Sequence, residues 1–234
     1  MKNEVYIIDG KRTPLGSFNG ELSSVVAPEL GAVVIKELIK GSGIELSQIN
    51  EVIMGNVLSA GLGQAPARQA ALKAGLPNSV ECLTINKMCG SGLKAVMLGM
   101  QAIQSGDAQV IISGGMENMS SVPYLLPKAR SGYRLGHGEI IDSMITDGLW
   151  DAYHDKHMGS CAEMLAEKNN ISREEQDEFA EQSYTKAQTA IESGWFTEEI
   201  VSVSVPQRKG TSIIVDQDEE PQRINFEKIK KLRP

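Results

Sequence analysis

One cysteine in this chain has the surroundings that a nucleophile needs. Cys89 lies in the stretch Asn86–Lys94, and Gly90, Ser91 and Gly92 follow it directly. A thiol that accepts an acyl group must meet its substrate closely, and glycines allow a ligand to approach the backbone. The stretch therefore indicates acyl transfer through Cys89, with backbone amides nearby to stabilise an oxyanion. On these residues alone, a small buried hydrophobic cysteine is the alternative interpretation.

The elements around Cys89 are predicted to place it at an elbow between a strand and a helix. Residues 83–85 have the character of a strand end, and the helix that follows is indicated by apolar residues three or four positions apart. This spacing predicts that one face is buried, made of Leu93, Val96, Met97, Met100 and Ile103. The unpaired N–H groups at the start of a helix favour a thiolate. The elbow would therefore present the thiol and help to ionise it.

Strands and helices alternate up to about residue 120. Buried strands are predicted at residues 5–9, 52–58 and 109–113, and helices at residues 30–41 and 65–74. Nearly unbroken apolar strands separated by helices are typical of a parallel sheet that is covered on both faces. The first part of the chain is therefore predicted to be an α/β unit.

The pattern changes after residue 119. A helix is predicted from His157, and Ser172 with Glu175 forms a capping box that opens a second helix, with Phe179 on its apolar side. Strands are predicted at residues 200–205 and 213–215. These elements predict a small α+β unit.

The residues around Cys89 resemble the signature of the reactive cysteine in the thiolases, the acetyl-CoA acetyltransferase family. Further motifs occur in the order and at the spacings of that family, namely Arg12–Gly16, Gly55–Val57, Gly61–Gln69, Gly114–Ser120 and His157–Gly159. The resemblance extends from Val5 to Pro234. It implies an α/β fold, the first half of the thiolase-like layered αβαβα architecture. Residues 1–118 would be the N-terminal half-domain with the nucleophile, and residues 119–234 an inserted α+β loop domain for coenzyme A binding and oligomerisation.

The resemblance also implies an activity. It is the reversible Claisen condensation of two acetyl-CoA to acetoacetyl-CoA and CoA through an acetyl-Cys89 intermediate. The later half of the family supplies a Gly-His-Pro histidine, an asparagine and a cysteine in Cys-x-Gly-Gly-Gly, none of which occurs in these 234 residues. We therefore expect the front part of a thiolase that is inactive by itself. The alternatives are a degradative 3-ketoacyl-CoA thiolase and a non-catalytic half-protein that binds acyl-CoA or supports assembly.

Five residues are candidates for binding the substrate. The resemblance places His157, Met158 and Leu149 around the acyl and pantetheine pocket. The alternative for His157 is a helix cap or a surface group, and the alternative for Leu149 is plain apolar packing. Arg223 and Lys228 are candidates for the phosphates of coenzyme A. A solvated charged face is the alternative for both, because this segment departs from the family's pattern.

A long segment and the composition add further expectations. Residues 123–139 have little periodicity and are predicted to be an excursion from the core. The resemblance implies that this loop joins dimers into tetramers; a mobile surface loop is the alternative. The acidic run at residues 216–220 is interpreted as a loop kept in water. We expect a homodimer or homotetramer whose other partners are acetyl-CoA and acetoacetyl-CoA.

Thirty acidic and 23 basic residues give a net charge of −7, which argues against nucleic acid and anionic membranes as partners. Three cysteines without paired spacing are typical of the reducing cytoplasm. No signal peptide, membrane span or metal-ligand spacing is recognisable, and no cofactor is expected beyond coenzyme A thioesters as substrates.

Overall fold

A three-stranded parallel sheet is the centre of the first unit in the computed structural model, which describes residues 4–207 and 210–232. The strands lie in the order β2-β1-β3, with bounds β1 Glu51–Gly55, β2 Glu81–Ile85 and β3 Ile111–Gly115. The central strand β1 pairs with both neighbours over its whole length. The parallel sheet predicted from the alternating pattern is confirmed.

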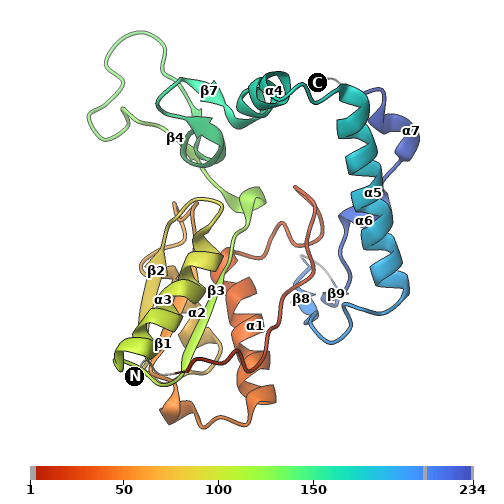
Figure 1. Cartoon of the computed structure of the whole chain (residues 1–234). Helices are drawn as coiled ribbons and strands as arrows, with labels where there is room; N and C mark the ends of the chain where they lie inside the picture. The colour runs from red at the N-terminus through yellow and green to blue at the C-terminus, as the bar shows by residue number, and fades with distance from the viewer. Residues whose placement is uncertain (1–3, 208–209, 233–234) are drawn as a thin grey trace.

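Three helices cover this sheet, and their bounds are α1 Ala27–Ser42, α2 Pro66–Lys73 and α3 Ser91–Ser105. Adjacent side chains of a strand point to opposite faces. A Cβ atom on Gly31 of α1 would lie 3.5 Å from Met54 Cε of β1 and 3.3 Å from Ala70 Cβ of α2. Gly55, which follows Met54 in β1, lies against α3 instead. Helices α1 and α2 therefore cover one face of the sheet and α3 covers the other (Figure 1).

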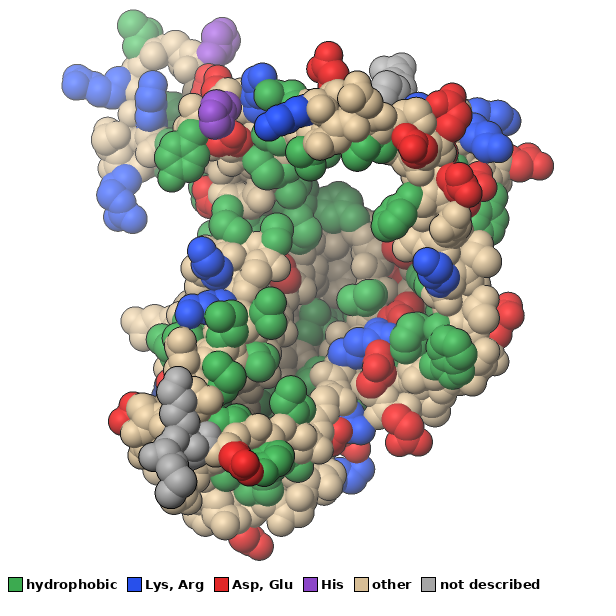
Figure 2. Space-filling view, viewed as in Figure 1, with side chains coloured by type: hydrophobic (Ala, Val, Ile, Leu, Met, Phe, Trp, Pro, Cys, Tyr) green, Lys and Arg blue, Asp and Glu red, His purple; other side chains and the backbone are tan. Residues whose placement is uncertain are grey.

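The face of α3 that packs on the sheet is not the predicted one. Ser91, Ala95 and Gly99 are buried, and a Cβ atom on Gly99 would lie only 2.6 Å from Ser113 Oγ. The predicted core face is largely exposed, with Leu93 at 70%, Met97 at 43% and Val96 and Met100 at 40% each, and Ile103 is half-buried. The small residues face the sheet because only they allow the helix axis to approach the strands so closely. Figure 2 shows hydrophobic side chains gathered over α3.

This exposed apolar face predicts self-association of residues 1–234 when they are produced alone. Covering an apolar helix face with a second surface removes it from water and lowers the free energy, which favours association. Replacing Leu93 and Met100 together with glutamine should shift the polypeptide toward monomer in size-exclusion chromatography with light scattering. Leu72→Gln on α2 is the control, because Leu72 is 39% exposed and lies outside this face. A monomeric wild-type polypeptide would contradict the prediction.

The strand predicted at residues 5–9 is wrong. The structure leaves this segment without strand pairing, and Tyr6, Ile7 and Ile8 are 73%, 85% and 67% exposed. An apolar run becomes a strand only where a neighbouring strand takes its hydrogen bonds, and none of β1, β2 and β3 pairs with it. The helix predicted to end at Gly41 ends at Ser42, and Gly43 follows with φ of +65°.

The second unit is an open arm that joins short strands to the helices α4 to α7, of which α5 is the longest. Their bounds are β4 Tyr124–Leu125, β5 Ile141–Asp142, β6 Trp150–Asp151, β7 Lys156–His157, α4 Met158–Lys168, α5 Arg173–Glu192, β8 Val203–Val205, β9 Ile213–Val215, α6 Glu220–Arg223 and α7 Phe226–Ile229. The segment predicted as an excursion, residues 123–139, includes β4, and residues 126–140 form the loop from β4 to β5 (Figure 1). The capping box of Ser172 and Glu175 is confirmed. The predicted apolar side of α5 is not buried at Phe179, which is 74% exposed, since the arm offers few surfaces to pack on.

Two apolar cores lie in the described residues. The larger core joins α1, α2 and the sheet, with Ile35 and Val52 almost fully buried. The smaller core packs Leu22 and Val25 against Val203, Val205 and Val215 of the β8–β9 hairpin. The arm therefore returns to the first unit at this hairpin, although it leaves the sheet after β3. The domain division at residues 118 and 119 stays a prediction.

Candidate functional site

Cys89 lies on the turn between β2 and α3, so the predicted elbow is confirmed. The turn is held by side chains: Asn86 Oδ1 accepts from the Met88 N–H at 2.9 Å, and Ser91 Oγ accepts from the Lys87 N–H at 2.9 Å. Ser91 Oγ also donates to the Met88 carbonyl at 2.6 Å. Met88 has a φ of +46°, a left-handed conformation that a side chain rarely adopts. These bonds hold Cys89 exposed at the start of α3.

The tightest contact beneath this turn is at Gly55, not at the glycines that flank Cys89. A Cβ atom on Gly55 would lie 2.5 Å from Ser91 Cβ and 2.8 Å from the Gly92 nitrogen. At Gly90, an added Cβ would be no closer than 3.5 Å to any neighbouring atom. The last residue of β1 therefore sets how closely the start of α3 approaches the sheet, and with it the position of Cys89.

Cys89 forms part of the wall of a cavity of about 640 Å³. Leu149, Arg12, Asn56 and Glu117 line the same cavity. The cavity thus places a thiol beside apolar, cationic and acidic groups from four separate segments. Such a site can take a molecule with an acyl group and a polar chain.

Asn56 and Glu117 are pocket residues that the sequence analysis missed. The Glu117 carboxylate accepts from the Val57 N–H at 2.8 Å, from the Leu58 N–H at 3.3 Å and from Asn56 Nδ2 at 2.8 Å. Burial raises the pKa of Glu117, and these three hydrogen bonds only partly oppose it. The sequence offered one indication of these two pocket residues: Asn56 lies in the Gly55–Val57 motif and Glu117 in the Gly114–Ser120 motif.

Leu149 is the predicted binding residue that lines the same cavity as Cys89. It ends a π-helical turn, Ile145–Leu149, and a Cβ atom on Gly148 would touch Leu58 Cδ2 at 3.3 Å. The turn therefore packs against the loop that Glu117 holds. This contact carries Leu149 to the cavity wall although it is 60 residues from Cys89 in the chain.

His157 and Met158 are not among the residues that line the cavity. His157 pairs with Trp150 across β6 and β7, and the two rings meet edge to face at 6.5 Å. His157 also caps α4, because its Nδ1 accepts from the Gly159 N–H at 3.0 Å. A neutral ring that accepts at Nδ1 carries its proton on Nε2. Met158, the first residue of α4, is 41% exposed.

Arg223 and Lys228 are exposed on α6 and α7, outside the cavity lining. Arg223 Nη1 forms an ion pair with Glu219 Oε1 at 2.6 Å. Two cations five positions apart thus lie on neighbouring short helices, and one of them is already neutralised by a carboxylate. The structure does not bring either of them to Cys89.

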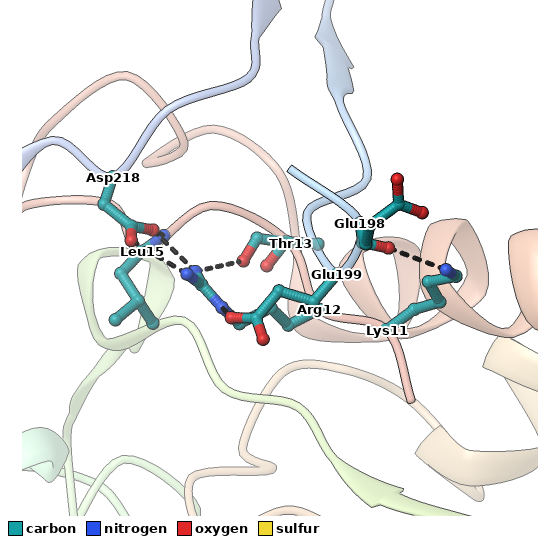
Figure 3. A network of polar contacts seen from close by, with 7 residues as sticks. All are labelled: Lys11, Arg12, Thr13, Leu15, Glu198, Glu199 and Asp218. Atoms are coloured by element: carbon teal, nitrogen blue, oxygen red, sulfur yellow. Dashed lines mark hydrogen bonds and ion pairs between the residues drawn. The ribbon is translucent and has the colours of Figure 1, made fainter. Parts of the chain in front are cut away.

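Part of the acidic run at residues 216–220 is buried, which corrects its interpretation as a loop kept in water. Asp218 is only 5% exposed, and its carboxylate accepts from Arg12 Nη1 at 2.7 Å, Arg12 Nη2 at 3.0 Å and the Leu15 N–H at 2.8 Å (Figure 3). Arg12 also binds Glu199 at 2.5 Å and lies over the Phe196 ring at 4.9 Å. Charged residues of a local acidic run become buried where a distant arginine compensates them.

This network predicts an acid-sensitive contribution to stability. Burial opposes ionisation of Asp218, but hydrogen bonds from Arg12 and Leu15 outweigh it, so the pKa of Asp218 lies below its ordinary value. A lowered carboxyl pKa stabilises the fold above the ordinary value of about 3.9 and loses this effect as the pH falls further. Asp218→Asn should lower the free energy of unfolding by about 1–3 kcal/mol at pH 7.

Urea unfolding of the wild type and of Asp218→Asn at several pH values tests this. The difference between the two proteins should narrow as the pH falls below about 4. Asp216→Asn is the matched control, because Asp216 is exposed on the same run. A difference that stays constant down to the acid range would show that the charge of Asp218 contributes nothing.

Two other features of the described residues bear on function. They hold no cluster of three histidine, cysteine or acidic side chains that could bind a metal ion. None of their helices combines the length and apolar character that crossing a bilayer requires.

Known proteins resemble this chain over almost its whole length. A family model described as "Thiolase, N-terminal domain" matches residues 5–234. An acetyl-CoA acetyltransferase of Pseudomonas aeruginosa is 55% identical over 232 residues, which are 99% of this chain and 59% of that protein. Acetyl-CoA acetyltransferase 2 of Arabidopsis thaliana is 51% identical over 232 residues, which are 99% of this chain and 58% of that protein.

A solved structure gives the same result for the fold. The crystal structure of the Bacillus anthracis acetyl-CoA acetyltransferase superposes with a TM-score of 0.93 at 41% identity, over 97% of this chain and 58% of that one. The expected layered α/β fold is confirmed by this likeness. The chain spans about three-fifths of the length of these relatives.

Proposed function

Because the chain belongs to the thiolase family, we propose that the native polypeptide carrying it is an acetyl-CoA C-acetyltransferase that uses Cys89 as its nucleophile. The observation that carries this proposal is the exposed Cys89 thiol on the wall of the 640 Å³ cavity, at the start of α3. The two relatives described above, from Pseudomonas aeruginosa and Arabidopsis thaliana, are named acetyl-CoA acetyltransferases. The proposed reaction is the reversible condensation of two acetyl-CoA to acetoacetyl-CoA and CoA.

The first step would form acetyl-Cys89. The thiolate of Cys89 attacks the acetyl carbonyl, the bond between that carbon and the CoA sulfur breaks, and CoA leaves with the proton that Cys89 lost. The Cys89 N–H would donate to the oxyanion. One donor of this kind contributes about 3–4 kcal/mol to the transition state.

The second step would form the carbon–carbon bond. A base removes an α-proton from a second acetyl-CoA, and the carbanion attacks the carbonyl of acetyl-Cys89, which releases the thiolate and yields acetoacetyl-CoA. The resemblance assigns the two proton transfers to a histidine and a cysteine of the family's later half. The residues that line the Cys89 cavity in the described part of the chain include no histidine. We therefore propose that residues 1–234 alone do not catalyse condensation.

The remaining candidates would bind the substrate. Leu149 would contact the acyl group, because it shares the cavity with Cys89. His157 would offer its Nε2–H to a carbonyl of the pantetheine chain, with Met158 beside it, since Nδ1 is occupied by the Gly159 N–H. Arg223 and Lys228 would meet the phosphates of coenzyme A.

The cellular location and the oligomeric state of the proposed enzyme are inferred from composition and from one exposed segment. We propose a cytoplasmic homodimer or homotetramer, with coenzyme A thioesters as substrates and no resident cofactor. Three free cysteines support the location, because disulfides are rare in a reducing compartment. The loop at residues 126–140, with Leu135 at 99% exposure, supports an assembly role.

The intact mass of the polypeptide from its native source, before and after acetyl-CoA, tests the proposal. We expect the mass to rise by one acetyl group, which peptide mapping then places on Cys89. Acetylation elsewhere, or none, would overturn the proposed role of Cys89. Binding of acyl-CoA without any adduct would instead favour a non-catalytic acyl-CoA-binding protein.

A further inference from the structure

Two adjacent carboxylates hold the N-terminal loop of the chain at several points. Asp218 binds the Arg12 guanidinium and the Leu15 N–H, as described above. Glu219 accepts from the Ser17 N–H at 2.9 Å and from the Glu21 N–H at 3.1 Å. The two residues therefore act as one latch, the 218–219 latch, which fixes residues 12–21 of the chain.

Backbone contacts join the same two segments. The Glu219 N–H donates to the Leu15 carbonyl at 3.0 Å, and Arg12 exchanges backbone hydrogen bonds with Glu199 and Val201, both at 2.8 Å. A Cβ atom on Gly20 would overlap the Glu219 carboxylate, so the loop and the latch fit without spare room. The 218–219 latch is therefore tightly packed against the loop.

The held loop forms one wall of the Cys89 cavity. Lys11, Arg12, Thr13 and Leu15 all line it. Arg12 is thus both a cavity residue and the main partner of Asp218, which itself lies outside the lining. Movement of Asp218 would be transmitted to the cavity wall through the bidentate Arg12 contact, whose two parallel bonds fix direction as well as distance.

We propose that Asp218, acting through Arg12 and Leu15, is a positioning residue that sets the wall of the thioester pocket formed by residues 11–15. This inference rests on the proposed function, because the pocket is taken to bind a coenzyme A thioester. Asp218 donates no proton and touches no substrate. Its role is to keep residues 11–15 where the substrate meets them, so it acts on binding more than on the chemical step.

Steady-state cleavage of acetoacetyl-CoA by the native polypeptide tests this, with Asp218→Asn compared with the wild type. We expect the KM to rise about tenfold while kcat changes by less than about threefold, the pattern of lost binding without lost chemistry. A purely structural role would instead reduce the fraction of folded enzyme, which lowers the apparent kcat at constant KM. Circular dichroism at the assay temperature measures that folded fraction.

Two further variants make the test independent of one substitution. Gly20→Ala disturbs the latch from the loop side without removing a charge, and it should raise the KM in the same direction. Arg68→Gln is the control, because Arg68 donates to the carbonyls of Asn78 and Val80 and lies outside the cavity lining. It should leave the KM unchanged.

The outcomes separate this inference from the proposed function. If wild-type enzyme turns over and both latch variants keep its KM, the positioning role is wrong and the proposed function stands. If the wild type neither cleaves acetoacetyl-CoA nor acquires an acetyl group on Cys89, the proposed function fails and this inference fails with it.

Discussion

Cys89→Ser should eliminate the acetyl-enzyme and lower kcat/KM for acetoacetyl-CoA cleavage by at least about a thousandfold, the largest effect expected in this protein. A serine hydroxyl at this turn keeps the size of the side chain but ionises far less readily than a thiol, so it is a much weaker nucleophile toward a thioester. The fold should survive, because Cys89 is exposed and contributes little packing. Rapid-quench mass analysis with acetyl-CoA, together with steady-state rates, measures both parts of the prediction.

Cys82 and Cys161 provide the matched controls. Both are half-buried, and neither lines the cavity. Burial raises the pKa of the Cys82 thiol against the opposing effect of Arg68, which disfavours a thiolate there. Cys82→Ser and Cys161→Ser should therefore keep the acetyl adduct and most of the activity. Retention of the adduct in Cys89→Ser, or its loss in Cys82→Ser, would place the nucleophile elsewhere.

Gly55→Ala should damage both stability and acylation. The new methyl group would lie 2.5 Å from Ser91 Cβ and 2.7 Å from the Ser91 carbonyl carbon, so the start of α3 must move away from the sheet. Overpacking of this kind costs about 1–3 kcal/mol of folding free energy. A displacement of about 1 Å at a reacting group costs about a hundredfold in rate. We expect a fall of that order in the rate of acetyl-Cys89 formation, measured by single-turnover acylation.

Gly41→Ala is the control for this substitution. Gly41 lies within α1, and an added Cβ would meet only Asp9 Oδ2 at 3.6 Å. Alanine at a helical position with room for its methyl group stabilises by about 0.5–1 kcal/mol. If Gly55→Ala and Gly41→Ala unfold at the same point and are acylated at the same rate, the prediction is wrong. The start of α3 then tolerates being moved away from the sheet.

The sequence predicted local features well where neighbouring residues determine them. The strand–turn–helix order around Cys89, the parallel sheet and the Ser172 capping box are all confirmed. The order around Cys89 and the capping box depend on propensity, apolar period or hydrogen bonds within a few residues, and the parallel sheet was indicated by the alternation of strands and helices along the chain. The motif around Cys89 likewise indicated a thiolase, because its glycines and its cysteine are adjacent in the chain.

The spacing of apolar residues failed on α3 for a physical reason. A helix can bury either its largest side chains or its smallest ones, and the choice depends on the surface that it meets. Here the strands offer Gly55 and Gly115, so α3 approaches with Ser91, Ala95 and Gly99. The hydrophobic period cannot report that choice, because the partner surface comes from residues tens of positions away.

Sequence by itself therefore determined the chemistry of one residue and the elements that carry it, namely Cys89 on a turn between a strand and a helix. Only the tertiary structure decided that Leu149 and Glu117 share its cavity and that Asp218 is buried on Arg12. Those outcomes depend on contacts between residues about 30 to 200 positions apart. A local pattern cannot specify them, because the free energy of a buried carboxylate or a packed leucine is set by whichever distant groups surround it.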